Sequence, residues 1–350
     1  MMTSRELVYA TLEGQNTSGR IPRQIWTLPW AWDNHGGMLR QLLADYPEDI
    51  GSAPAVCREV PRTVGNPYAV GEYVDEWGCR FTNIHKGIIG EVKDPLIPSE
   101  DDGWDNRNHI HIPEELLTFD VDAVNRHCAG SDRFILGGCC PRPFERLQFI
   151  RGTENLYMDL LDPPAGMQEF MRQLHDFYCR LLTAWAKTDI DALNIMDDWG
   201  AQNSLLIRPD LWRELFRPLY RDYIDIAHSY GKKIFMPSDG YTLDILPDLA
   251  ELGLDAINAQ VFCIGLDKLA SFRGKITFWG EIDRQHILPE GTEEDVCRAV
   301  GDYCRTFWQD GKCIAQLEFG PGARPDNVRT AYEAFDRFVS DTGDNVSSKI

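Results

Sequence analysis

Eight short apolar runs, separated by longer stretches with helical periodicity, constrain the fold more than any other feature of the chain. Such runs are typical of strands buried on both faces of a parallel sheet. Eight parallel strands with intervening helices close into a (β/α)8 barrel, the TIM barrel, so the sequence predicts this α/β class. A doubly wound open sheet is the alternative. The runs are RQIWTLPW at 23–30, DIGSAPAV at 49–56, RFILGG at 133–138, DALNIM at 191–196, KKIFMP at 232–237, DAINAQ at 255–260, KITFWG at 275–280 and KCIAQLEFG at 312–320.

The segments between these runs carry helix signals. Between residues 209 and 231, apolar side chains such as Leu211, Leu215 and Leu219 fall on one stripe at i, i+4 and i+8 spacing, which predicts one amphipathic helix. Thr292 and Asp295 have the spacing of a capping box, which predicts the start of another helix.

Residues 57–131 interrupt the alternation of strands and helices. The stretch YAVGEYVDEWGCRFTNIHKGIIGEV alternates as antiparallel strands do, and a polar loop follows it. Long insertions of this kind usually cover an active site. We therefore expect a single domain over residues 1–350, with 57–131 inserted after the second strand and capping the barrel mouth.

The charge balance bears on partners and location. Lys and Arg number 35 against 55 Asp and Glu, which gives a formal net charge of −20. Such a chain repels nucleic acid and anionic membrane surfaces. No apolar run approaches the roughly 18 residues of a membrane span, and the first residues do not read as a secretion signal. We expect a cytoplasmic protein with reduced cysteines and with neither nucleic acid nor membrane as a partner.

Acidic residues stand at the ends of four predicted strands. Asp197 and Asp198 follow one strand, Asp239 and Glu281 follow two others, and Glu318 lies within the last. Active sites of parallel barrels gather at the carboxyl ends of the strands, so Asp197, Asp198, Asp239 and Glu281 are the catalytic candidates. Acids at such positions also cap helices, which is the structural alternative for each of them.

Two physical limits apply to this set of acids. Side chains alternate along a strand, so only one of Asp197 and Asp198 can face the interior, while its neighbour caps the turn that Gly200 permits. Several carboxylates at one rim also repel one another unless a cation lies among them or some are protonated.

Candidate substrate-binding residues stand near other strand ends. Arg142 and Arg146 begin the helix after the third strand, where a guanidinium can anchor a carboxylate or phosphate, or can instead pair with a neighbouring acid. Trp30 and Trp199 can wall a flat substrate, and Gln202 follows in the same loop as Trp199. The eight histidines form neither HxxxH nor HExxH, so conventional zinc spacing is absent.

An ordered set of motifs resembles the uroporphyrinogen decarboxylase superfamily, and more narrowly its decarboxylase-like or corrinoid methyltransferase-like branch. The resemblance extends from RELVYATLEGQ to NVRTAYEAF and implies a (β/α)8 barrel with its site in the mouth. The motifs are DDWGAQ, RPDLWRELFRPLYRDYIDIAHSYGKKIF, PSDG, ILPDLAELGLDAINAQ, KITFWGEIDRQHILPEGTEEDV and PDNV.

The chain departs from both well-known activities of that superfamily. Decarboxylases carry an arginine-rich motif after the first strand and a histidine near the C-terminus, whereas TLPWAWDNHGG has no arginine before Arg40 and EFGPGARP has no histidine. Methyltransferases hold zinc through a His-x-Cys-Gly stretch and a later cysteine, whereas Pro237, Asp239 and Leu317 stand at those positions. A thiolate zinc site is therefore lost. Asp239 and Glu318 would suit a harder or borderline divalent metal, if one is bound.

Methyl transfer between a small molecule and a corrinoid or thiol carrier is the activity that the resemblance implies. Asp239, Glu318 and Asp197 would then bind a metal or act as acid and base groups. Two alternatives stay open: decarboxylation of a tetrapyrrole or another carboxylate, with Asp198 or Asp239 stabilising a cationic intermediate, and a non-catalytic barrel that binds a corrinoid or a partner protein. The resemblance also implies a corrinoid protein as partner and a homodimer.

Overall fold

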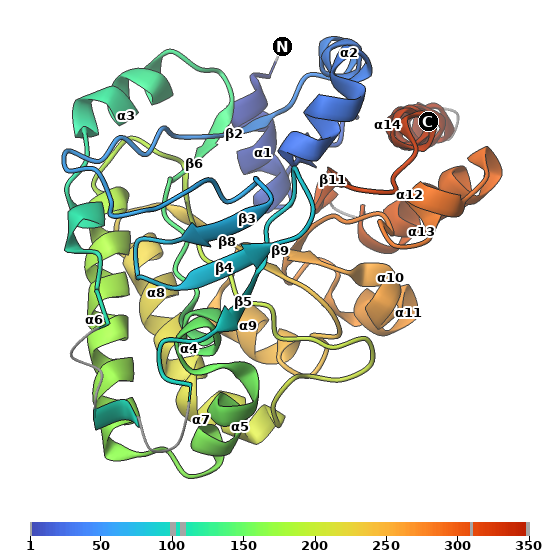
Figure 1. Cartoon of the computed structure of the whole chain (residues 1–350). Coiled ribbons are helices and arrows are strands. Elements are labelled where there is room, and N and C mark those ends of the chain that lie inside the picture. Colours follow the sequence, from blue (N-terminus) through green and yellow to red (C-terminus); the bar gives the residue numbers. More distant parts are fainter. Residues whose placement is uncertain (1, 99–102, 106–109, 309–310, 348–350) are drawn as a thin grey trace.

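The computed structural model describes residues 2–98, 103–105, 110–308 and 311–347, and its main sheet confirms the predicted α/β barrel class (Figure 1). Eight parallel strands occur in the order β1-β11-β10-β9-β8-β7-β6-β2. Between the end strands β1 and β2, the amide of Asp49 donates to the carbonyl of Arg23 at 2.9 Å. The strands are β1 Arg23–Thr27, β2 Ile50–Ser52, β6 Phe134–Leu136, β7 Ala192–Asn194, β8 Lys233–Ser238, β9 Ala256–Ala259, β10 Thr277–Trp279 and β11 Cys313–Phe319.

Helices follow the strands and surround the sheet (Figure 1). The capping box of Thr292 and Asp295 starts α13, as predicted. The helix expected over 209–231 is two helices that meet at Phe216, because Pro218 lacks the N–H of a continuous helix. The helices are α1 Ser4–Leu12, α2 Pro29–Asp45, α3 Val121–Ala129, α4 Pro143–Arg151, α5 Thr153–Leu161, α6 Ala165–Ala186, α7 Pro209–Leu215, α8 Arg217–Ser229, α9 Leu246–Leu252, α10 Val261–Ile264, α11 Leu266–Leu269, α12 Ile287–Glu290, α13 Glu293–Phe307 and α14 Pro325–Ser347.

The alternating segment after β2 forms a separate antiparallel sheet, as the sequence predicts. Its strands are β3 Gly71–Val74, β4 Arg80–Asn83 and β5 Glu91–Asp94. This sheet contacts the barrel where the parallel strands end: the Gly87 carbonyl accepts a hydrogen bond from the Trp30 amide at 3.1 Å, and the rings of Phe81 and Phe149 lie 5.1 Å apart.

Apolar side chains sort into two clusters because neighbouring residues of a strand point to opposite faces. On β8, Ile234 and Met236 belong to the larger cluster between strands and helices. Phe235 belongs instead to a small cluster with Phe134 and Trp279, to which α1 adds Val8. Members of the small cluster, among them Trp279 and Leu136, also line a cavity of about 470 Å³ that is bordered by several of the parallel strands.

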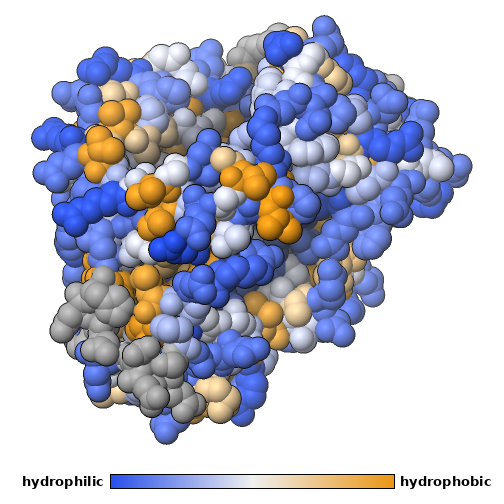
Figure 2. Space-filling model, in the orientation of Figure 1, coloured by the Kyte–Doolittle hydropathy of each residue, from blue (hydrophilic) through white to orange (hydrophobic). Residues whose placement is uncertain are grey.

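The surface is mostly polar, as expected from the net charge, and orange side chains gather over the inserted sheet (Figure 2). Exposed apolar residues of this segment include Val60, Val64, Val70, Ile84 and Ile89. Within the described ranges, none of the helices is both long enough and apolar enough to cross a membrane.

Candidate functional site

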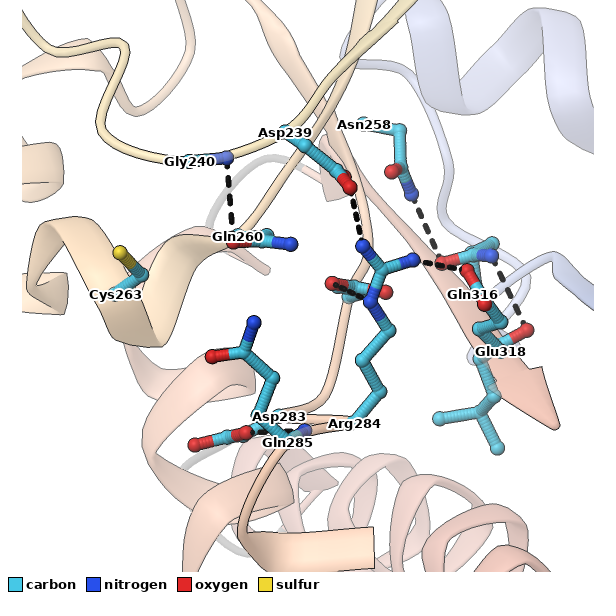
Figure 3. A network of polar contacts seen from close by, with 12 residues as sticks. Asp239, Gly240, Asn258, Gln260, Cys263, Asp283, Arg284, Gln285, Gln316 and Glu318 are labelled. Atoms are coloured by element: carbon cyan, nitrogen blue, oxygen red, sulfur yellow. Dashed lines mark hydrogen bonds and ion pairs between the residues drawn. The ribbon is translucent and has the colours of Figure 1, made fainter. Parts of the chain in front are cut away.

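A single arginine lies among three carboxyl groups at the carboxyl ends of β8, β10 and β11 (Figure 3). Arg284 belongs to the loop between β10 and α12. One of its terminal nitrogens donates to Asp239 and the other to Glu318. Its Nε lies 3.4 Å from Oε1 of Glu281. We call Asp239, Glu281, Arg284 and Glu318 the acidic cluster.

The least exposed member of the acidic cluster is Glu281, whose side chain is 3% exposed. Burial raises the pKa of Glu281 most. The ion pair with Arg284 lowers this pKa, and repulsion from Asp239 and Glu318 raises it again, so that the net pKa is about 8. Among the described residues, its Oε2 atom finds no hydrogen-bond partner. Glu281 is therefore a mainly protonated carboxyl group at neutral pH, with a proton to give.

The loop that carries Arg284 is fixed by a second acid. Asp283 accepts hydrogen bonds from the amides of Gln285 and His286, both at 2.8 Å. This Asx turn holds the backbone on the C-terminal side of Arg284. Asp283 thus has a structural role here, and Glu281 and Arg284 are the residues of this loop that meet the other strand ends.

The adjacent acids after β7 have different surroundings. Asp197 is fully buried. Its carboxylate accepts hydrogen bonds from two amides at the start of α4, those of Phe144 at 3.1 Å and Glu145 at 2.9 Å. It accepts a third from the hydroxyl of Tyr220 at 2.5 Å. Burial raises the pKa of Asp197 well above its usual range. Asp197 is thus a helix cap held inside the protein.

Asp198 lies instead at the strand end next to Asp239, whose amide donates to its Oδ1 at 3.0 Å. Burial first, and then repulsion from Glu145 and Asp239, raises the pKa of Asp198 to about 7. Of the two neighbouring acids, Asp198 is the one that stands beside the acidic cluster.

Two glycines bring the ends of β7 and β8 into contact. A Cβ atom on Gly200 would lie 2.1 Å from the amide nitrogen of Tyr241, and one on Gly240 would lie 2.1 Å from the Gly200 carbonyl oxygen. Gly240 also has a φ of 77°. Only glycine permits this approach and this conformation, so Gly200 and Gly240 allow Asp198 and Asp239 to meet.

Arg284 separates two cavities at this end of the barrel. The smaller, of about 100 Å³, is lined by Glu281, Arg284, Cys263 and Gln202, among others. The Gln202 side chain donates to Oε1 of Gln285 at 3.3 Å across this cavity. The larger, of about 480 Å³, adjoins Arg284 and Glu318. Glu281 thus borders the smaller cavity, Glu318 borders the larger one, and Arg284 borders both.

The other expected substrate-binding residues lie in different surroundings. Trp199 is fully buried, its ring stacks on Phe144 at 4.2 Å, and it lines neither of these two cavities. Trp30 is half-buried near the end of β11, with its ring 6.3 Å from that of Phe319. Arg146 pairs with Asp75 of the insertion and is not part of the acidic cluster.

Arg142 lines a cavity on the other side of β7, between β6, α6 and the insertion, and Arg146 borders the same cavity. Arg146 donates to Asp75 at 2.5 Å, with both side chains almost fully buried. Arg142 lies 3.7 Å from Oε2 of Glu145 and donates to the sulfur of Cys140 at 3.6 Å.

The oxygen-rich metal site considered for Asp239 and Glu318 does not fit this arrangement. The guanidinium of Arg284 lies between the two carboxylates and donates a hydrogen bond to each of them. A cation already neutralises this oxygen pair, and a metal ion would have to displace it. Across the described residues, no group of three or more His, Cys, Asp or Glu side chains has a geometry that could hold a metal ion.

Sequence reasoning missed Arg284, although it expected either a cation among the acids or protonated acids. The available signal was its position, three residues after Glu281 and in the loop after a predicted strand. Sequence could not show that this side chain turns back over the strand ends instead of pairing outward with Asp283.

Solved structures that match the chain include a methyltransferase and a methionine synthase, and only the first resembles it well enough to show a shared fold. A methyltransferase from Methanosarcina mazei matches with a TM-score of 0.69 at 15% identity, covering 97% of this chain and 99% of that chain. A B12-independent methionine synthase from Shewanella sp. matches with a TM-score of 0.46 at 14% identity, covering 95% of this chain and 98% of that chain. At these identities the likeness concerns the fold alone. No curated protein sequence matches the chain.

A protein-family model agrees with the resemblance that the sequence motifs carry. The family described as uroporphyrinogen decarboxylase (URO-D) matches residues 75–338, which is most of the chain. This protein therefore belongs to the uroporphyrinogen decarboxylase family.

Proposed function

We propose that the chain transfers a methyl group from a methylated small molecule to a corrinoid or thiol carrier, with Glu281 as the acid that protonates the leaving group. One observation carries the proposal. Glu281 is a buried carboxyl group at a cavity, beside Arg284, with a pKa raised to about 8 and with an Oε2 atom that lacks a partner among the described residues. Such a group is suited to general acid catalysis near neutral pH.

The proposed step balances in atoms and charge. The bond between the methyl carbon and its oxygen, nitrogen or sulfur breaks, and the electron pair stays on that heteroatom. The heteroatom takes the proton of the Glu281 carboxyl, while the methyl group joins the nucleophile that the carrier supplies. Glu281 is left as a carboxylate with the guanidinium of Arg284 3.4 Å away, which stabilises the new charge.

The composition of the acidic cluster supports this role for Glu281. Three carboxyl groups surround one guanidinium, so full ionisation would leave an excess of negative charge in a partly buried place. The most buried of the three keeps its proton because desolvation penalises its charged form. Arg284 therefore both holds the cluster together and stabilises the carboxylate that forms after proton transfer.

Methyl transfer accounts for the site better than decarboxylation of a tetrapyrrole with many carboxylates. The cation at the centre of the acidic cluster is already engaged by three acids, and further carboxylates would meet repulsion there. The fold shared with the Methanosarcina mazei methyltransferase supports the same choice. No step is assigned to a metal.

We also propose that residues 57–131 cap the mouth of a single-domain barrel.

The test is a methyl-transfer assay with a panel of O-, N- and S-methyl donors and with reduced cobalamin or a small thiol as acceptor. We expect transfer from at least one donor by the wild-type protein. Glu281→Gln should reduce the rate about 100- to 10,000-fold, because it cannot donate the proton. Glu290→Gln, on the exposed end of α12, is the matched control and should keep the wild-type rate.

The same preparation is incubated with uroporphyrinogen, and release of CO2 is measured. Turnover of uroporphyrinogen without methyl transfer from any donor would contradict the proposal and favour the decarboxylase alternative. An equal rate of methyl transfer in the wild type and in Glu281→Gln would remove Glu281 from the mechanism.

A further inference from the structure

The cavity of about 300 Å³ between the end of β6, α6 and the insertion has a wall that the proposed chemistry leaves unused. Aromatic rings make much of it, and the rings of Phe119 and Trp185 stack at 4.2 Å. Aromatic side chains present flat apolar faces to a ligand. The aromatic residues at this cavity are Trp77, Phe119, Phe177, Tyr178 and Trp185.

One cation of this cavity, Arg142, makes only a loose ion pair and donates no hydrogen bond to a carboxylate among the described residues. The guanidinium of Arg142 is mostly enclosed, with its side chain 28% exposed. Its nearest recorded carboxylate oxygen, on Glu145, is 3.7 Å away, beyond hydrogen-bond distance. Arg142 donates a hydrogen bond to the sulfur of Cys140 at 3.6 Å, which is a weak acceptor. Arg142 therefore keeps donors available for an anion.

Two further polar atoms at this place are buried without partners among the described residues. They are Nε of Arg146 and Oε2 of Glu145. The Arg146 side chain is only 7% exposed. Its guanidinium pairs closely with Asp75 and more loosely with Glu76 at 3.9 Å, and it lies over the ring of Trp77 at 4.8 Å. A buried N–H without an acceptor costs free energy unless a ligand or water satisfies it.

The thiols at this cavity add no opposing charge. Burial raises the pKa of Cys139 to about 12, and burial also raises the pKa of Cys57 and Cys140. All three remain neutral near pH 7. The cavity thus combines flat apolar walls with two guanidinium groups, and its charge is only loosely balanced where Arg142 lies 3.7 Å from Glu145 and Arg146 lies 3.9 Å from Glu76.

We propose that this cavity binds a small aromatic carboxylate, with the ring between the aromatic walls and the carboxylate on Arg142. This inference rests on the proposed function, since it assigns the methyl donor to the class of single-ring aromatic acids with a methylated substituent. A cavity of about 300 Å³ is at the small end of the range of ligand sites, which suits one ring.

The position of Glu145 connects this cavity to the acidic cluster. Glu145 lies beside Arg142, and repulsion from Glu145 contributes to the raised pKa of Asp198. Asp198 in turn accepts from the amide of Asp239, which contacts Arg284. A donor held by its carboxylate on Arg142 would therefore lie beside Glu145, whose charge acts on the acids that we assign to the chemistry.

Isothermal titration calorimetry with benzoate, 4-methoxybenzoate and benzamide tests the site without requiring turnover. We expect both acids to bind and benzamide to bind less tightly. Arg142→Gln should weaken benzoate binding about 10-fold or more, because a charge-assisted bidentate contact is lost, and should leave benzamide binding nearly unchanged. Arg172→Gln, on the exposed face of α6, is the matched control and should bind as the wild type does.

A second variant guards against a folding defect in the first. Ala55 is exposed at the edge of the cavity, so Ala55→Phe should fill it and abolish benzoate binding while the melting temperature stays near that of the wild type. Benzoate binding that neither variant weakens, or no binding of either acid to the wild type, would overturn the inference.

The outcomes separate this inference from the proposed function. Benzoate binding that depends on Arg142, together with no methyl transfer from any donor, would support the cavity and contradict the methyltransferase proposal. Methyl transfer from an aliphatic donor, together with no binding of aromatic acids, would support the methyltransferase proposal and contradict the assignment of the cavity.

Discussion

Two arginines on opposite sides of β7 meet acids in contrasting ways. Arg146 makes a close ion pair with Asp75, in which both side chains are at most 7% exposed, and a looser one with Glu76 at 3.9 Å. Arg284 contacts three carboxyl groups and is 23% exposed. The first arrangement attaches the insertion to α4 through one close ion pair. The second leaves excess acid, which favours a protonated Glu281. A buried acid that keeps its proton because several acids share one cation, rather than the presence of an ion pair, separates a candidate catalytic contact from a structural one.

The largest expected difference between the two arginines concerns stability. Arg146→Met removes the partner of buried Asp75 and should lower the free energy of unfolding by about 3 to 5 kcal/mol. Arg284→Met should lower it by only about 1 to 2 kcal/mol, because the remaining carboxyl groups can take up a proton or contact water. Urea unfolding followed by circular dichroism measures both. Equal losses in the two variants would break the comparison.

A matched pair of substitutions sharpens the contrast between neighbouring acids. Asp197→Ala removes the cap of α4 and leaves the Tyr220 hydroxyl without its acceptor, so we expect a loss of about 2 to 3 kcal/mol. Asp198→Ala should cost less than about 1 kcal/mol, since it removes a single contact to a backbone amide. The same unfolding experiment compares them. A larger loss for Asp198→Ala would reverse the roles that we assign.

The smallest expected effect is a pH dependence of stability. The pKa of Glu281 is about 8 in the folded protein, against a usual value of 4.5, so the folded state binds more protons between these values. The stabilisation is complete below the lower value and is lost as pH rises through about 8. Between about pH 5 and 8.5, the melting temperature of the wild type should therefore fall about 2 to 4 °C more than that of Glu281→Gln.

Scanning calorimetry at several pH values checks this slope. Glu290→Gln should follow the wild type, because that exposed residue is not part of the acidic cluster. A Glu281→Gln slope as steep as that of the wild type would assign the pH dependence to other groups.

The fold was largely predictable from sequence because its signals are local. The eight strands follow from apolar runs, and the start of α13 follows from Thr292 and Asp295. The break at Phe216 was also readable from Pro218, but the continuous apolar stripe of the two helices hid it.

The site was only partly predictable because it depends on where side chains turn after the strands end. Sequence placed Asp239, Glu281 and Glu318 at strand ends but could not reveal the direction of Arg284. Nor could it show that Asp75, in a distant segment, draws Arg146 into the protein. Such choices are made by tertiary contacts between residues far apart in the chain.

The protonation state of Glu281 tests the central claim most directly and needs no substrate. Infrared difference spectroscopy during a pH titration, comparing wild type with Glu281→Gln, isolates the carboxyl stretch of this residue. We predict a protonated carboxyl band in the wild type at pH 7 that disappears as pH rises through about 8 and is missing from the variant. A Glu281 carboxyl that is already ionised at pH 6 would contradict the account.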